Sequence, residues 1–236
     1  MKQFKKTQKA GEGDINLSPL RTAWRQRKSG TPSEHWLEKD SHYFFHQSLS
    51  TPCLDVVQSC SGSVRTNLEG HQYLDFHGNS VHQIGFSHPK VIDAVKQQMD
   101  ELPFCTRRYT NIPAIQLAEK LCSLMGGDHK VLFAPGATTA IGMALKLMRR
   151  VTGRFKTISM WDAFHGASLD AISVGGEAIF RSHIGPLLPG TEHVPPPNPV
   201  SCILNPEGRC ATCNLRCARY IEYVLEKEGD IGAVIA

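Results

Sequence analysis

The sequence predicts an α/β protein with a mainly parallel sheet and flanking helices on both faces, plus a small N-terminal α+β segment. Strand-like and helix-like runs alternate from residue 130 onward, which is typical of a parallel sheet. Short β-type runs separated by turns occupy residues 54–76. With 236 residues, 41% of them hydrophobic and 20% charged, the chain has ordinary globular composition and can bury a sizeable core.

These patterns divide the chain into three segments. Residues 1–53 are an N-terminal arm, 54–112 the small α+β segment, and 113–236 the first part of a large domain with a Cys-rich insertion at 195–217. The arm is polar but carries aromatic anchors that suit docking on its own domain or on a partner subunit: Trp24, Trp36, Tyr43, Phe44 and Phe45.

The net charge of +4 is modest and unevenly distributed. The first thirty residues hold eight Lys or Arg and two acidic residues, so they carry +6 and the remainder −2. A solvated basic arm explains this, and no nucleic-acid-binding motif is present. No long apolar run occurs, so we expect neither a signal peptide nor a membrane span, and the cytoplasm is the default location.

Residues 54–76 read as a meander of short antiparallel strands. Leu54–Val57 and Gln72–Phe76 are the clearest β-type runs. The turn-rich segments between them are Ser61-Gly62 and Asn67–Gly70.

Two helices and a polar loop follow the meander. The first helix begins at Pro89, and the second runs from about Pro113 to Met125. The apolar stripe of the first helix consists of Val91, Ile92, Val95 and Met99. The intervening loop holds Arg107 and Arg108, whose planar forks suit phosphate or phosphonate oxygens. Exposed loop arginines without a ligand are the alternative.

The first candidate site lies between residues 130 and 146. Lys130–Phe133 is a predicted strand, residues 134–138 a loop of small residues, and Thr139 onward a helix. A strand that leads into a helix N-terminus presents backbone N–H groups and the positive end of the helix dipole, which suits a phosphate. A nucleotide P-loop is not supported, because no Gly-Lys-Ser/Thr ending is present. An ordinary strand–loop–helix connection is the alternative.

The second candidate site is the segment Trp161–Ser168. It follows a predicted strand, Thr157–Met160, and contains Phe164-His165-Gly166. Core packing is the alternative role of such a Phe–His pair. Beyond it we expect a short helix at 168–172, a break at 175–176, a helix at 218–227 and a buried strand at 231–236. The second of these helices should turn Ile221, Val224 and Leu225 inward.

Four cysteines lie in the insertion: Cys202, Cys210, Cys213 and Cys217. Cys210-x-x-Cys213 has the spacing by which two thiolates can share a tetrahedral zinc, and four thiolates could also hold an iron–sulfur cluster. Loop thiols without a metal are the favoured interpretation, and a structural zinc is the alternative. Eight cysteines in all are few for a disulfide scaffold of this length.

Several motifs resemble the class III, or omega, aminotransferases, which bind pyridoxal 5′-phosphate (PLP). Asn67–Phe76 and Gly85–Pro89 resemble that family's Asp-x-x-Gly-x-x-Tyr-Leu-Asp-Phe and Gly-His-x-His-Pro segments. Gly136–Ala140 stands where the family has Ser-Gly-Thr-Glu-Ala, and Phe164–Ser168 matches Tyr/Phe-His-Gly-x-Thr/Ser. The resemblance implies the fold of type I PLP-dependent transferases. It reaches only the first half of a family member, so the chain reads as truncated.

The resemblance also implies a cofactor site. It places Gly136, Ala137 and Thr138 at the cofactor phosphate, Phe164 against the pyridine ring, and His165 beside the ring or phosphate. Gly136 and Ala137 replace a family Ser and Gly, which keeps the backbone donors and removes one hydroxyl. The family's Schiff-base lysine and the aspartate of the pyridine nitrogen would follow Ala236. The catalytic residues are therefore unknown, and we expect the 236-residue chain alone to be inactive.

The family acts on small primary amines, usually as a homodimer. Thr106–Tyr109 is similar to a loop of the family's phospho-lyases, and the whole sequence looks most like members that eliminate ammonia from a hydroxy-aminoethylphosphonate. An ω-transaminase that transfers an amino group to a keto acid is the alternative. A non-catalytic truncated or metal-binding protein is the alternative from another functional class.

Overall fold

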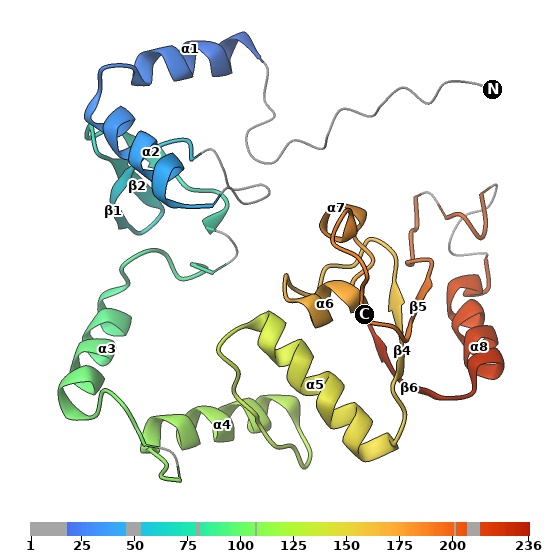
Figure 1. Cartoon of the computed structure of the whole chain (residues 1–236). Helices are drawn as coiled ribbons and strands as arrows, with labels where there is room; N and C mark the ends of the chain where they lie inside the picture. Colours follow the sequence, from blue (N-terminus) through green and yellow to red (C-terminus); the bar gives the residue numbers. More distant parts are fainter. Residues whose placement is uncertain (1–17, 46–52, 79–80, 107, 201, 207–212) are drawn as a thin grey trace, which may run out of the picture. The chain divides into compact units, whose positions relative to one another are not determined.

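The computed structural model describes residues 18–45, 53–78, 81–106, 108–200, 202–206 and 213–236 (Figure 1). The chain forms two compact units, Met1–Gln116 and Leu117–Ala236. The division into three segments expected from the sequence stays a prediction.

The first unit contains a three-stranded antiparallel sheet. Its strands are β1 (Val57–Ser61), β2 (Val64–Asn67) and β3 (Gln72–Leu74), in that order. The predicted meander is confirmed, but its first strand begins at Val57 and not at Leu54. Val57 pairs with Asn67, the last residue of β2, so residues 54–56 have no remaining partners in that strand.

Two helices precede this sheet, where the sequence suggested only a polar arm. They are α1 (Pro19–Lys28) and α2 (Pro32–Tyr43), and each begins with a proline after Ser or Thr. Trp24 of α1 packs edge-on against Tyr73, with ring centroids 6.1 Å apart, so this anchor docks on its own unit. The other four anchors are 53–95% exposed: Trp36, Tyr43, Phe44 and Phe45.

A polar cluster joins the two helices to the meander. Lys28 Nζ lies 2.5 Å from Asp55 Oδ1 and 3.0 Å from Glu69 Oε2. The buried Asn67 donates its side-chain amide to both carboxylates, at 3.0 and 2.9 Å. The backbone N–H of Ser33 donates to Glu69 at 3.0 Å. Hydrogen bonds from Ser33 and the charge of Lys28 lower the pKa of Glu69 to about 2.

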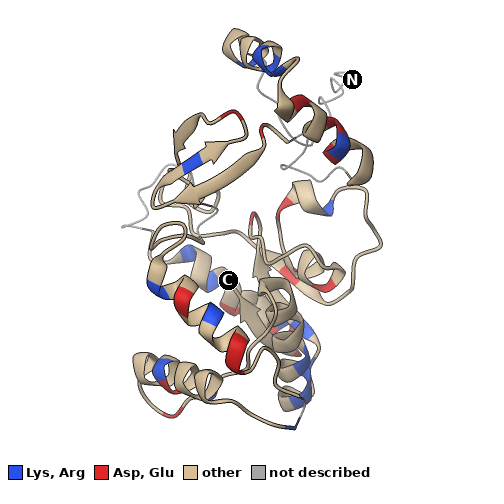
Figure 2. Ribbon diagram, turned by 90° about the vertical axis from the view of Figure 1, so that its left-hand side faces the viewer, with Lys and Arg blue, Asp and Glu red and all other residues tan. Residues whose placement is uncertain are grey.

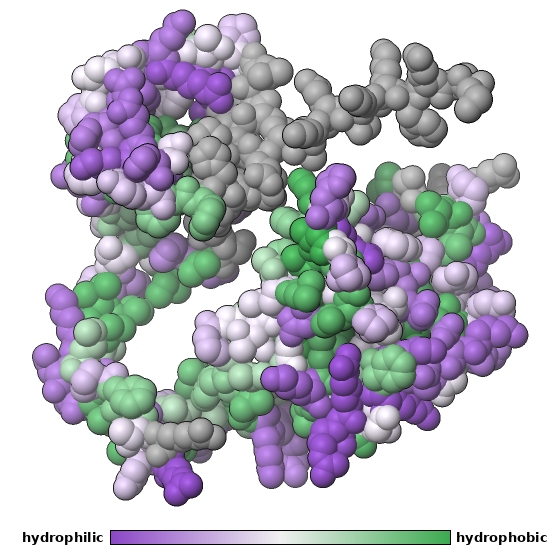
Figure 3. All heavy atoms as spheres, viewed as in Figure 1, coloured by the Kyte–Doolittle hydropathy of each residue, from purple (hydrophilic) through white to green (hydrophobic). Residues whose placement is uncertain are grey.

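Helix α3 (Pro89–Glu101) forms where its proline start and apolar stripe predicted it, and α4 (Ile112–Met125) begins one residue earlier than expected. The stripe of α3 is 41–63% exposed and is visible as apolar surface in Figure 3. Helix α3 is therefore present, although its apolar face is not buried by any of the described residues.

The second unit contains a three-stranded parallel sheet. Strand β4 (Lys156–Met160) lies between β5 (Thr191–Val194) and β6 (Ile231–Ile235). Ile158 is fully buried and pairs with Glu192 on one side and Val234 on the other. The parallel sheet predicted from the alternation of strands and helices is confirmed.

Helices cover both faces of this sheet, as Figure 1 shows for α5 (Ala137–Thr152) and α8 (Arg216–Glu228). Ile231 belongs to the core cluster against which Ile221 and Val224 of α8 pack. Neighbouring Gly232 meets α5, where an added Cβ would lie 2.1 Å from Met148 Sδ. Successive strand residues point to opposite faces, so the two helices lie on opposite sides.

Several expectations for the second unit are wrong. Helix α5 begins at Ala137 and not at Thr139, and Val234, in the strand expected to be buried, is 45% exposed. Leu225 is 41% exposed, because Ile221 and Val224 supply the inward face of α8. Lys130–Phe133 forms no strand, and Leu132 is 73% exposed. A strand requires a hydrogen-bonded neighbour, and among the described residues β4, β5 and β6 pair only with one another.

Acidic and basic side chains lie together on some helices (Figure 2), whereas α1 and α5 carry basic residues alone. Helix α3, for example, carries Lys90, Asp93, Lys96 and Asp100. Among the described residues, no helix has the length and apolar character needed to cross a membrane.

Candidate functional site

The two candidate segments of the second unit meet in the structure. The Ser168 backbone N–H donates to Thr138 Oγ1 at 3.1 Å, and the two hydroxyl oxygens are 2.5 Å apart. Gly166 makes this approach possible. Its φ is +128°, and an added Cβ would lie 2.7–2.9 Å from atoms of Thr138. The loop after β4 therefore packs directly on the start of α5.

Asp170 bonds Ser168 and packs against the side of α5, so it supports the Thr138–Ser168 contact. It follows Ser168 at the start of α6 (Leu169–Val174) and accepts hydrogen bonds from the Ser168 hydroxyl and from the Ala171 N–H, the latter at 2.9 Å. The bond from Ser168 is the main cause of the lowered pKa of Asp170. Gly142 leaves room for the carboxylate, because an added Cβ would lie 2.6 Å from Asp170 Oδ2.

The start of α5 has the properties of an anion site. Gly136 is the N-cap in extended conformation, and no side chain caps the helix. The backbone N–H groups of Ala137, Thr138 and Thr139 donate to no acceptor among the described residues. The first turn contains no acidic residue, so the positive end of the helix dipole is not neutralised there. Together these donors suit a phosphate.

Phe164 and His165 follow β4 on the same loop. The Phe164 side chain is 53% exposed and contacts Phe180 of α7 (Ala178–Arg181), with ring centroids 4.5 Å apart. Much of the Phe164 ring is therefore available to a flat heteroaromatic ligand. His165 Nε2 lies 3.2 Å from Ser159 Oγ on β4, and burial lowers the pKa of His165. The imidazole is therefore expected to be neutral at pH 7.

A ligand with a phosphate group and a flat ring fits this arrangement. The start of α5 offers unpartnered N–H groups, the Phe164 ring offers an open surface, and Ser168 with Gly166 holds the two parts together. The roles of Gly136, Ala137, Thr138, Phe164 and His165 toward a cofactor stay predictions.

The other predicted site residues lie elsewhere. Arg108 is in a loop of the first unit, with a positive φ of 77°, and Arg107 lies outside the described residues. Cys210 also lies outside them. Cys213 is buried, whereas Cys202 and Cys217 are half-buried. The described residues contain no cluster of three or more His, Cys, Asp or Glu side chains able to hold a metal. The four-cysteine metal site stays a prediction.

Sequence reasoning missed the surroundings of Phe164. The Trp161 ring is stacked on His193 of β5 at 4.5 Å, and the Arg181 guanidinium lies 5.4 Å from the Trp161 ring centroid. Gly176 packs so closely that an added Cβ would be 2.2 Å from the Met160 carbonyl oxygen. The adjacent glycines 175 and 176 were a signal in the sequence, but they indicated only a break.

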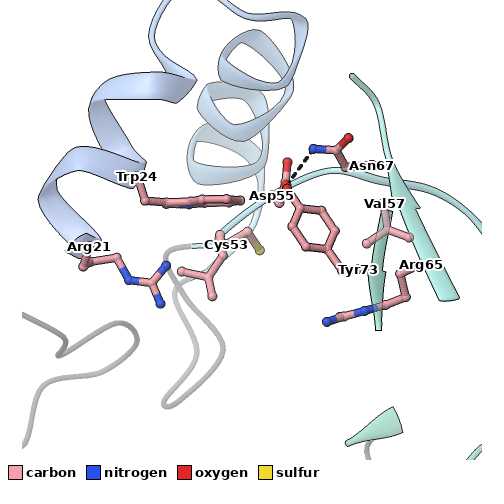
Figure 4. A pocket seen from close by; sticks show the side chains of 9 residues that line it. Arg21, Trp24, Cys53, Asp55, Val57, Arg65, Asn67 and Tyr73 are labelled. Carbon is pink, nitrogen blue, oxygen red and sulfur yellow. Dashed lines mark hydrogen bonds between the residues drawn. The ribbon is translucent and has the colours of Figure 1, made fainter. Parts of the chain in front are cut away.

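The first unit has a separate cavity of about 380 Å³ (Figure 4). The rings of Trp24 and Tyr73 and the side chains of Arg21 and Arg65 line it, together with Asp55, which accepts a hydrogen bond from Asn67. Of the residues predicted from the sequence to bind cofactor, substrate or metal, those that the structure describes do not line this cavity.

Known proteins resemble this chain in both sequence and structure. It is 49% identical, over 99% of its length, to the (R)-1-hydroxy-2-aminoethylphosphonate ammonia-lyase of Vibrio splendidus, of which it covers 51%. It is 37% identical, over 54% of its length, to the acetylornithine aminotransferase of Methanopyrus kandleri, covering 33% of that protein. The chain thus spans about half the length, or less, of these curated relatives.

Two solved structures show the same fold. The omega transaminase from Pseudomonas jessenii in complex with PMP matches with a TM-score of 0.77 and 25% identity, over 84% of this chain and 48% of that one. A PLP-bound amine transaminase from an uncultivated Pseudomonas species matches with a TM-score of 0.73 and 25% identity, over 82% of this chain and 48% of that one.

The family assignment rests on a match that covers most of the chain. Residues 46–236 match the model of the aminotransferase class-III family. The motifs that suggested this family, Asn67–Phe76, Gly136–Ala140 and Phe164–Ser168, all lie within the matched range. The chain belongs to the class III aminotransferases.

Proposed function

We propose that the full-length protein is a PLP-dependent ammonia-lyase that acts on (R)-1-hydroxy-2-aminoethylphosphonate, a small primary amine. The observation that carries this proposal is the 49% identity, over nearly the whole chain, to the Vibrio splendidus enzyme of that name. The arrangement in the second unit supports the cofactor, because a phosphate-type site and an exposed aromatic ring lie on segments joined by the Thr138–Ser168 contact.

Each cofactor-site residue has a distinct task in this proposal. Bound PLP supplies an electron sink for the carbon chemistry next to the amine. The N–H groups of Ala137 and Thr138 would hold the phosphate, with Gly136 leaving space beside it. Phe164 would cover one side of the pyridine ring, and the neutral His165 would contact the ring or phosphate without adding charge.

Arg107 and Arg108 are the proposed ligands of the substrate phosphonate. A guanidinium can donate two parallel hydrogen bonds to phosphonate oxygens, which a lysine cannot reproduce. Replacement of Arg108 by Lys should therefore raise KM for the phosphonate substrate while leaving the absorption spectrum of bound PLP unchanged. A spectrum altered as much as KM would place Arg108 at the cofactor instead.

The decisive experiment uses the full-length natural protein with PLP and 2-amino-1-hydroxyethylphosphonate, and measures ammonia release without a keto acid. Steady release establishes the lyase. No release, with turnover that requires pyruvate or 2-oxoglutarate, establishes an ω-transaminase. That alternative is favoured by one observation, namely that both of the solved structures described above are amine or omega transaminases.

We also propose that the protein is a cytoplasmic homodimer, as the family resemblance implies. Exposed apolar side chains on α4 support further protein contacts, since Leu124 and Met125 are each 71% exposed. Sedimentation of the full-length protein at twice the mass of one chain would support the dimer, and a single-chain mass would contradict it.

Stoichiometric zinc or iron in metal analysis of the full-length protein would support the proposed cysteine site.

A further inference from the structure

We propose that Phe180 is a positioning residue for the cofactor site, acting through Phe164. This inference rests on the proposed PLP site. Phe180 belongs to α7, a helix of only four residues, and its ring centroid is 4.5 Å from that of Phe164 at an interplanar angle of 41°. The half-exposed Phe164 ring therefore has a partner that restricts its rotation.

Arg181, which follows Phe180 and is the last residue of α7, contacts the loop that follows β4. The Arg181 guanidinium lies over the Trp161 ring, 5.4 Å from the ring centroid. His193 is itself stacked on Trp161 and contacts the Val174 and Gly175 carbonyl oxygens at 3.1 and 3.0 Å. Two adjacent residues of α7 thus contact two rings of one loop, Trp161 and Phe164.

The connection that leads into α7 is also tied to this loop. The backbone N–H groups of Gly176 and Glu177 both donate to the Ala163 carbonyl oxygen, at 2.8 and 3.2 Å. Gly176 has no room for a side chain beside Met160. Backbone hydrogen bonds and ring contacts both join residues 174–181 to residues 161–164. We call residues 174–181 the brace, because they restrict the movement of the loop that carries Phe164. Phe180 is the part of the brace that touches the ring expected to face the cofactor.

The test uses the full-length natural protein and three variants. Phe180→Ala removes the contact, Phe180→Leu restores apolar bulk, and Phe155→Ala is the matched control. Phe155 is a half-exposed phenylalanine just before β4, so it lies at the opposite end of that strand from Phe164. The readouts are PLP affinity, the circular dichroism of bound PLP, and hydrogen exchange of the Phe164–His165 amides without cofactor.

Phe180→Ala should speed exchange at Phe164–His165, weaken PLP affinity about threefold to tenfold and reduce the cofactor dichroism. Phe180→Leu should recover part of each effect, and Phe155→Ala should change none. Equal effects of Phe180→Ala and Phe155→Ala, or no effect of Phe180→Ala, would overturn the positioning role. If the unmodified protein binds no PLP, the proposed function fails, and the positioning role of Phe180 fails with it even where exchange still rises.

Discussion

Replacement of Glu69 by Gln tests whether the polar cluster around Lys28 holds the N-terminal helices on the meander. The Glu69 side chain is 14% exposed and accepts hydrogen bonds from Lys28, Asn67 and the Ser33 N–H. A pKa that falls from 4.5 to about 2 corresponds to about 3 kcal/mol of stability at neutral pH. Allowing for residual solvent at the site, we expect Glu69→Gln to lower the free energy of unfolding by about 2 kcal/mol.

The pH dependence has a definite sign. The folded-state pKa of Glu69 is depressed, so its contribution is complete above the unfolded pKa of 4.5 and is lost as the pH falls toward about 2. The stability difference between the natural protein and Glu69→Gln should therefore be constant near pH 7. It should shrink below about pH 4.5 and nearly vanish near pH 2.

Urea unfolding followed by fluorescence can measure this difference. Trp24 packs on Tyr73 beside the cluster, so its fluorescence reports unfolding at this position. Glu38→Gln is the matched control, because Glu38 is an exposed carboxylate on α2 and should change stability by less than about 0.5 kcal/mol. The reasoning is refuted if the two variants are equally stable at pH 7, or if the Glu69→Gln deficit persists unchanged near pH 2.

Three further predictions concern the second unit. Gly166→Ala should cost about 2–3 kcal/mol in thermal unfolding, because its Cβ would meet Thr138, whereas Gly136→Ala, in open space at the N-cap of α5, should cost about 1 kcal/mol or less. Thr138→Val should weaken PLP binding about tenfold through loss of the Ser168 hydrogen bonds, and Thr138→Ser should retain them; equal affinities for both variants would contradict this role. His165 should titrate by NMR below 6.5, also in Ser159→Ala, because burial is the cause of its lowered pKa; a pKa at or above 6.5 would contradict this account.

Much of the fold could be predicted because its signals are local. Pro89 begins α3, α4 ends at Met125, and the turn after Asn67 separates β2 from β3. Helices α1 and α2 were missed although Ser18-Pro19 and Thr31-Pro32 carry the same kind of start signal. The polar composition of the arm obscured that signal.

The strand predicted at Lys130–Phe133 shows where local reasoning fails. Its apolar residues favour a strand, but strand formation requires a partner, which no pattern of four residues can supply. Leu225 illustrates the same limit, because helical spacing allows several inward faces and the position of the sheet selects one. The candidate site was located by motifs, whereas its supporting residues were not.

The sequence by itself determined the α/β class, the meander, the start of α3, the approximate starts of α4, α5, α6 and α8, and the two segments, Gly136–Thr138 and Phe164–His165, that suggested a cofactor site. Periodicity, caps and turns depend on near neighbours, so they can be read along the chain. Only the tertiary structure decided that Ser168 bonds Thr138, that Asp170 lies over Gly142, and that Phe180 packs on Phe164. These contacts join residues 16 to 30 positions apart, and their geometry arises from packing that no local pattern encodes.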